Sequence, residues 1–313
     1  MPDIVVMFFL LGMVAGLVRS ELKIPKEAYD VLSLLLMLTI GLKGGMALHG
    51  NLSYSLAFNL AGIVVLSACI PLILFPILRH VVGLSYVNSG SLAAHYGSVS
   101  AGTFAVALAY AESNQLALGS EVTLYLVFME LPAIIVGIAL YKRFSRQPGA
   151  KASSNLWKET LTNRSVILLV GGVIIGFMYG PLNGSTVTDL FTGAFKGVLA
   201  LFLLEMGLTA AAPLQRMQFS QWRLLVFAII APVCLSLLGI TTGLLLGLET
   251  GSILILASLT ASASYIAAPA AIKNSIPEAD IGLAMLVSLG ITFPFNVIIG
   301  IGFYHWMIGL VAG

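Results

Sequence analysis

The chain is poor in charged residues. Only 9% of its 313 residues are Asp, Glu, Lys or Arg, whereas 59% are apolar. A soluble domain carries about 25% charged residues, so this composition excludes a soluble globular protein. The net charge of +2 provides no basic excess for binding nucleic acid. We therefore interpret the chain as an integral membrane protein that has the lipid bilayer as a partner.

Features of several other protein classes are also missing. The ten-residue alternation of an outer-membrane barrel is absent, and the apolar runs have the length of membrane helices, about 20 residues each. No second histidine stands at metal-binding spacing from His95, so we expect no transition metal and no cofactor. The serine-hydrolase pattern Gly-x-Ser-x-Gly does not occur, and Ser100 and His95 share one short segment, so we expect no enzyme. The two cysteines, Cys69 and Cys234, lie in apolar runs and are interpreted as buried small hydrophobes.

Ten apolar segments have the length of membrane-spanning helices. They are 4–19, 29–48, 55–78, 90–112, 120–142, 165–181, 191–214, 222–246, 252–273 and 280–311. The connectors that follow odd-numbered segments hold 13 of the 15 lysines and arginines. Because positive charge stays on the cytoplasmic side, we expect a multi-pass protein with both termini outside. The most basic connector, 143–164, is interpreted as a solvated cytoplasmic linker, with a docking segment for a regulator as the alternative.

The two halves of the sequence resemble each other. Segment 91–112 reads SLAAHYGSVSAGTFAVALAYAE and segment 257–278 reads ASLTASASYIAAPAAIKNSIPE, so that Ser98 falls on Ser264 at an offset of 166 residues. Each half holds five predicted spans, an odd number, so the second half enters the membrane from the opposite side. We therefore predict an all-α membrane protein built from two inverted five-helix repeats. The predicted units are 1–142, the linker 143–164, and 165–313.

Small and polar residues interrupt the fourth and ninth predicted spans at their centres. An interrupted membrane helix is costly, because its loose backbone groups find no water, and paired interruptions indicate a transport site. The starts of two half-helices carry partial positive charge and free N–H groups that suit a small anion, while hydroxyls and freed carbonyls suit Na⁺. The alternative is that small residues only permit close helix packing. The predicted substrate-binding residues are Gly97, Ser98, Ser100, Ala101, Gly102, Thr103, Ser262, Ser264, Tyr265 and Ala268.

Three of the charged residues inside predicted spans are candidate functional or structural residues. Glu130 is a candidate ion ligand or proton carrier, because an acid within a membrane helix is a functional candidate, and structural pairing is the alternative. With Ser98 and Ser264 it forms the predicted set for ion binding or coupling. Lys43 and Glu205 occupy corresponding spans of the two halves. We expect them to form a structural ion pair, with a role in gating or coupling as the alternative.

Four segments resemble the sodium-dependent bicarbonate transporter family of bacteria, the SbtA type. They are IPKEAYDVLSLLLMLTIGLKGGMAL (24–48), GSVSAGTFAVALAYAE (97–112), FMELPAIIVGIAL (128–140) and TASASYIAAPAAIKNSIPEADIG (260–282). The resemblance implies core and gate domains, broken helices 4 and 9 that cross in the core, and a homotrimer in the bacterial inner membrane. It also implies Na⁺ and bicarbonate at the crossing. Glu130 then takes the place of a family aspartate, and Tyr265 stands where the family has an acid.

We therefore expect a secondary active transporter that imports a small anion, with sodium-dependent bicarbonate symport as the first reading. One alternative is a transporter of another small anion or carboxylate with different ion coupling. A second is a membrane sensor that binds ligand without transport. A soluble cytoplasmic regulator would dock on connector 143–164, although this connector is much shorter than the regulatory loop of the family.

Overall fold

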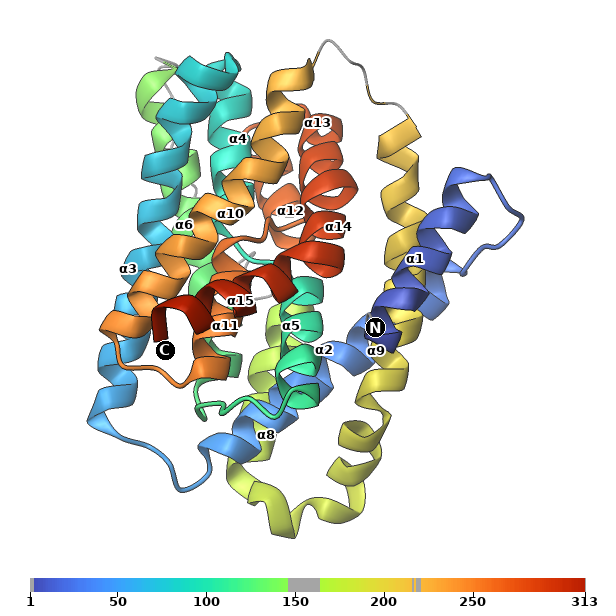
Figure 1. Ribbon diagram of the computed structural model, residues 1–313, viewed down its shortest axis with the longest axis vertical. Coiled ribbons are helices and arrows are strands. Elements are labelled where there is room, and N and C mark those ends of the chain that lie inside the picture. The colour runs from blue at the N-terminus through green and yellow to red at the C-terminus, as the bar shows by residue number, and fades with distance from the viewer. Residues whose placement is uncertain (1–2, 146–163, 216, 218–220, 313) are drawn as a thin grey trace.

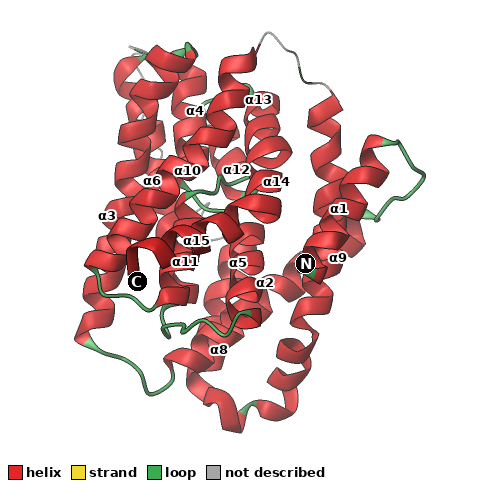
Figure 2. Cartoon of the chain, viewed as in Figure 1, coloured by secondary structure: helices red, strands yellow, loops and turns green. Residues whose placement is uncertain are grey.

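The computed structural model describes residues 3–145, 164–215, 217 and 221–312. Every element within these ranges is a helix, and they contain no strand (Figure 2). The first half contains α1 (Ile4–Leu17), α2 (Lys26–Leu48), α3 (Tyr54–Pro76), η1 (Ile77–Val82), α4 (Tyr86–Gly97), α5 (Ala101–Ser113) and α6 (Val122–Phe144). The second contains α8 (Arg164–Asn183), α9 (Ser185–Gln215), α10 (Trp222–Leu245), α11 (Thr250–Thr260), α12 (Ala267–Ser275), α13 (Ile281–Met285), η3 (Leu286–Thr292), α14 (Phe293–Phe295), η4 (Asn296–Gly300) and α15 (Ile301–Ala312). Most of the predicted linker, 146–163, lies outside the described residues.

Eight helical segments are long and apolar enough to cross a membrane, so the chain is a multi-pass membrane protein. They are Lys26–Leu48, Tyr54–Val82, Tyr86–Ser113, Val122–Phe144, Val166–Asn183, Ser185–Gln215, Trp222–Leu245 and Ile281–Val311. The other two predicted spans contain only shorter apolar helices, Ile4–Leu17 and Thr250–Thr260. In the first predicted span the helix ends at Leu17. In the ninth predicted span α11 ends at Thr260, and the next helix begins only at Ala267.

Helices α1, α2, α8 and α9 form a group of their own, the four-helix group. Within it α1 packs along α9 and α2 packs along α8; Figure 1 shows α1 beside α9 at one edge of the molecule. Glycines allow the approach of α2 to α8, because a Cβ added to Gly41 would lie 2.4 Å from the carbonyl oxygen of Leu169, and one added to Gly45 would lie 2.1 Å from that of Val173. Small residues four positions apart let membrane helices pack backbone against backbone.

The remaining helices form the larger group. In this group α4 packs on α3 and α6, and α11 packs on α10 and α5. Segment Ile281–Val311 is a single long span that contains two stretches of π-helix, η3 and η4, on either side of Phe293–Phe295. Helices that widen into π-turns often do so at functional sites. This group holds the short half-helices α4, α5, α11 and α12 at the centre of the molecule (Figure 1).

The cysteines are less buried than the sequence predicts. Cys69 is half-buried and Cys234 is exposed. The interpretation of both thiols as buried core residues is therefore wrong for Cys234. Cys234 lies on the outer face of α10 beside Ile230, which is 54% exposed. On a membrane protein such an apolar outer face is covered by lipid, so an apolar span need not mean burial in protein.

Candidate functional site

The first helix interruption lies between α4 and α5. Helix α4 ends at Gly97 and α5 begins at Ala101, with Ser98 and Ser100 in extended conformation between them. The Ser100 hydroxyl caps α5, because its Oγ accepts a hydrogen bond from the backbone N–H of Thr103 at 3.1 Å. The Thr103 hydroxyl also donates to the same oxygen at 3.1 Å. The chain therefore leaves one helix and starts the next within three residues.

Gly97 allows this interruption to sit against its neighbours. A Cβ added to Gly97 would lie 2.6 Å from the ring of Pro71 in α3 and 2.7 Å from the Cβ of Ala133 in α6. Distances this short do not occur between real Cβ atoms and their contacts, so only glycine fits here. The first interruption is thus enclosed between α3 and α6.

The second interruption is longer and is held from a different direction. Helix α11 ends at Thr260 and α12 begins at Ala267. The backbone carbonyl of Ala261 accepts a hydrogen bond from the Asn296 side-chain amide at 2.8 Å, and the Asn296 carbonyl oxygen accepts one from the Tyr304 hydroxyl at 2.6 Å. All these groups are buried. The first bond satisfies a backbone carbonyl that α11 leaves free, and the second satisfies the side-chain oxygen of Asn296.

The two interruptions contact each other directly, at a place here called the crossing. The backbone N–H of Ser100 donates to the Ser262 hydroxyl at 3.0 Å. In the opposite direction, the backbone N–H of Ser264 donates to the carbonyl oxygen of His95 at 2.8 Å. The structure therefore brings together the predicted site residues of both halves, although they are more than 160 positions apart in the sequence. The hydroxyl-bearing residues gathered there are Ser98, Ser100, Thr103, Ser262 and Ser264, and each is at most 2% exposed.

The Ser98 hydroxyl at the crossing has no partner. Ser98 Oγ is buried and makes no hydrogen bond with any described residue, and the same holds for His95 Nε2. The other ring nitrogen of His95, Nδ1, lies 2.7 Å from the carbonyl oxygen of Ser91. Leaving a buried polar group unpaired costs about 1–3 kcal/mol, so such a group needs an explanation. A polar ligand at the crossing would provide the missing partner for Ser98.

Tyr265 points into the crossing. Its ring packs edge-to-face on Phe293, with centroids 5.3 Å apart. Its hydroxyl lies over the first turn of α5, where a Cβ added to Gly102 would be only 2.3 Å from Tyr265 Oη. The hydroxyl is buried and has no hydrogen bond of ordinary geometry with a described residue. A residue larger than glycine at position 102 would displace it, so Gly102 and Tyr265 share the space at the start of α5.

A cavity of about 240 Å³ reaches the crossing from one end of the molecule. It lies between the four-helix group and the larger group. Six of its lining residues are Lys26, Tyr29, Glu205, Thr209, Tyr265 and Leu289. Near the other end of α2 the two groups are tied together, because Lys43 forms an ion pair with Glu112 of α5 and Lys196 Nζ donates to Ser113 Oγ at 2.9 Å.

Comparison with known protein families gives the family of the chain. A family model described as the Na⁺-dependent bicarbonate transporter superfamily matches residues 4–309. The chain belongs to this superfamily. The match confirms the family resemblance found in the sequence. A comparison with curated proteins finds no match.

The sequence predicts an ion pair between Lys43 and Glu205, and the structure corrects this prediction. Lys43 pairs with Glu112, and its Nζ also lies 4.5 Å from the centre of the Phe195 ring. Glu205 instead accepts a hydrogen bond from the Thr209 hydroxyl at 3.1 Å and lines the cavity. The physical reason is the packing of α2: its last turns face α5, so that Lys43 meets an acid from the larger group. Correspondence in the repeat does not make two residues neighbours.

Glu130 is not joined to the crossing by a hydrogen bond or an ion pair. No such contact links its carboxylate to any other described residue of the chain. It lies in α6 three residues before Ala133, which abuts Gly97. Its role in ion coupling therefore stays a prediction.

Sequence reasoning missed the side chains that support the crossing. Asn296 and Tyr304 hold the second interruption, and the Tyr96 hydroxyl is 2.6 Å from that of Thr292 behind the first. The signal for Asn296 was present, since it is an amide inside an otherwise apolar run, FPFNVII. Among the described residues of this superfamily member, no three His, Cys, Asp or Glu side chains are grouped to hold a metal ion.

Proposed function

We propose that this chain is a secondary active transporter that imports bicarbonate with Na⁺ across the bacterial inner membrane. The observation that carries the proposal is the contact between the two helix interruptions, made by Ser100 with Ser262 and by Ser264 with His95. A buried cluster of hydroxyls with one unpaired member, Ser98, fits a small polar solute better than it fits helix packing alone.

The start of α5 is the proposed anion position. The amides of Ala101 and Gly102 open this helix and have no intrahelical acceptor, and a helix start attracts negative charge. The start of α12, with Ala268 N already bonded to Ser264 Oγ at 3.1 Å, faces the same crossing from the other half. Bicarbonate has both acceptor oxygens and an O–H donor, so hydroxyls that can donate or accept suit it.

Oxygen atoms near the same place are the proposed Na⁺ ligands. The hydroxyl of Ser98 is unpaired, and the helix ends at Gly97 and Thr260 leave backbone carbonyls free of intrahelical partners. Hard cations prefer such neutral and anionic oxygens. Na⁺ beside the anion would offset its charge, with Ser98 and Ser264 as proposed ligands. Glu130 is retained as a proposed coupling residue because it is an acid within a membrane helix.

Helix packing supports the proposed pair of inverted repeats. In an inverted repeat α1 would correspond to α8, and α2 to α9. The counterpart of the α1–α9 contact is then the α8–α2 contact, and both contacts occur. Likewise, the contact of α3 with α4 corresponds to that of α10 with α11. We propose that the four-helix group is the gate domain and the larger group is the core domain, in which interrupted helices 4 and 9 cross.

The two ends of the boundary between these domains support an inward-facing state. The cavity opens beside Lys26 at the start of α2, on the side where the charge distribution places the cytoplasm. At the other end Lys43 and Glu112 join the gate to the core. In the proposed cycle this ion pair opens when the site faces outward.

Co-transport of one Na⁺ and one bicarbonate moves no net charge, so the membrane potential, worth about 2.3 kcal/mol per charge at 100 mV, would not contribute. The Na⁺ concentration gradient, or a second Na⁺, would then drive uptake.

Uptake into proteoliposomes tests the proposal. The purified protein is reconstituted, and entry of labelled bicarbonate is followed at alkaline pH with an inward Na⁺ gradient, with an equal K⁺ gradient, and with Na⁺ on both sides. We expect uptake above the empty-liposome rate only with the Na⁺ gradient. Competition by formate, acetate and nitrate distinguishes bicarbonate from another small anion or carboxylate. Na⁺-dependent binding without uptake would instead indicate a sensor and would overturn the transport proposal.

The assembly and regulation follow only from the family resemblance. We propose a homotrimer, and a soluble cytoplasmic regulator that docks on 143–164. Mass photometry of the purified protein tests the first, and pull-down with the linker deleted tests the second.

A further inference from the structure

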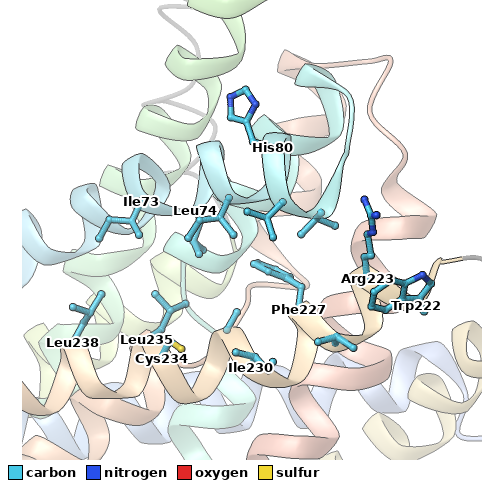
Figure 3. A pocket seen from close by; sticks show the side chains of 15 residues that line it. Ile73, Leu74, His80, Trp222, Arg223, Phe227, Ile230, Cys234, Leu235 and Leu238 are labelled. Carbon is cyan, nitrogen blue, oxygen red and sulfur yellow. The ribbon is translucent and has the colours of Figure 1, made fainter.

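A second cavity, of about 670 Å³, is lined mostly by apolar side chains. It is a groove between α3 and η1 on one side and α10 on the other, here called the α3–α10 groove. Figure 3 shows apolar side chains of the two sides facing each other, with Arg223 and Trp222 at one end and Leu238 toward the other. The walls lie on the outer surface, since Ile73 is 42% exposed and Ile230 is 54% exposed.

An arginine lies at one end of the groove. It is Arg223, beside Trp222, whereas His80 lines the groove from η1. The Arg223 guanidinium lies 5.6 Å from the Trp222 ring but makes no ion pair or hydrogen bond with any described residue. None of the described residues that line the groove is an acid. The neighbouring Arg79, by contrast, already has a partner in the protein, because its guanidinium donates a hydrogen bond to the carbonyl of Leu84 at 2.8 Å.

The dimensions and the orientation fit one kind of occupant. From Trp222 to Leu238 the wall of α10 runs for about 24 Å at 1.5 Å per residue, more than the roughly 15 Å of hydrocarbon in one leaflet. The charged end lies at the start of α10, on the side that the positive-charge rule makes cytoplasmic, where anionic lipids are concentrated. We propose that the α3–α10 groove binds an anionic phospholipid of the inner leaflet, with its phosphate at Arg223 and an acyl chain along α10. This proposal uses the proposed membrane orientation but not the transport activity.

The groove is close to the crossing. Phe227 lines the groove and packs edge-to-face on Tyr96, with ring centroids 5.1 Å apart. Tyr96 is the residue before Gly97, where α4 ends. Ala228, next to Phe227, accepts a hydrogen bond from the Thr292 hydroxyl at 2.8 Å. A lipid in the groove would thus support the wall behind the first interruption.

Quenching of tryptophan fluorescence by brominated lipids tests the proposal. Trp157→Phe and Trp306→Phe leave Trp222 as the sole tryptophan. The matched control keeps Trp306 instead, which is equally exposed at 58% but lies on α15. Each protein is reconstituted with a low fraction of brominated phosphatidylglycerol or brominated phosphatidylcholine. We expect Trp222 to report about five-fold tighter binding of phosphatidylglycerol, the preference that one cation near an anionic lipid provides, and Trp306 to report no preference.

Two substitutions identify the headgroup contact. Arg223→Gln should remove the preference at Trp222. Arg19→Gln changes an exposed arginine on the four-helix group and should leave it intact. Equal quenching by the two lipids at Trp222, or a preference that survives Arg223→Gln, would overturn the proposal. Relief of quenching by inorganic phosphate would also overturn it, because the groove would then hold a free anion. Because no step measures uptake, failure here leaves the transport proposal unaffected.

Discussion

The two helix interruptions meet at one place but are built differently. The first takes three residues, and its own Ser100 caps the helix that follows. The second takes six, and Ile266, the residue before α12, provides no cap, although Ser264 Oγ accepts a hydrogen bond from Ala268 N at 3.1 Å. Its free carbonyl at Ala261 is satisfied by Asn296 from a distant helix. The first interruption is therefore supported locally, and the second depends on tertiary packing.

This difference predicts how each interruption responds to substitution. Changes to the support of the second should destabilise the core most, whereas changes to the first should cost less stability and also affect binding. The four predictions below run from the largest expected effect to the smallest.

Asn296→Ala should cause the largest loss. It leaves the Ala261 carbonyl and the Tyr304 hydroxyl buried and unpaired, at about 1–3 kcal/mol each. Thermal unfolding in detergent should occur at a clearly lower temperature, and uptake should be lost. The control is Asn51→Ala, which removes an amide that also donates to a backbone carbonyl at 2.8 Å but is exposed, so that water replaces it. Equal unfolding temperatures for the two variants would contradict the proposed support.

Ser100→Ala should reduce both stability and transport. Loss of a helix cap costs about 1 kcal/mol, and Thr103 loses an acceptor as well. Ser85→Ala is the matched control, because Ser85 caps α4 by accepting from Asn88 N at 3.2 Å, far along the helix from the crossing. We expect comparable unfolding shifts but impaired uptake only for Ser100→Ala. Similar uptake in both variants would limit Ser100 to a structural role.

Ser98→Ala should separate binding from stability. The Ser98 hydroxyl has no partner in the protein, so its removal should leave the unfolding temperature unchanged or slightly higher. If it is a ligand, the half-saturating concentration of Na⁺ or bicarbonate should rise roughly ten-fold, equivalent to about 1.4 kcal/mol. Ser89→Ala removes another buried, unpaired hydroxyl, two turns and more before the interruption, and should leave both concentrations unchanged.

Tyr265→Phe should have the smallest effect. The substitution keeps the ring against Phe293 and removes only the hydroxyl over Gly102. A typical hydrogen bond contributes about 0.5–1.5 kcal/mol net, so the half-saturating bicarbonate concentration should rise roughly three-fold without loss of stability. Tyr110→Phe removes a hydroxyl that lies near His305 instead, and is the control. A lower half-saturating concentration in Tyr265→Phe would mean that the hydroxyl obstructs the site.

Part of this architecture is readable in the sequence because it has local causes. Apolar runs indicate the spans, and the small and polar residues around Ser98 and Ser264 mark where helices stop. The family resemblance also follows from contiguous segments. The ion pair was predicted wrongly because the partner of Lys43 depends on how α2 lies against α5, and Glu112 appeared to be only the end of a span. Asn296 was missed because its partner, Ala261, is a backbone carbonyl 35 positions away.

By itself the sequence determined that this protein lies in the membrane, that helices end near Ser98 and near Ser264, and which family it belongs to. These properties depend on the chemistry of consecutive residues and their cost in lipid. Only the tertiary structure decided that the two interruptions form hydrogen bonds with each other, that Tyr265 faces the start of α5, and that Lys43 pairs with Glu112. Such contacts depend on the rotation and depth of each packed helix, which short-range patterns do not specify.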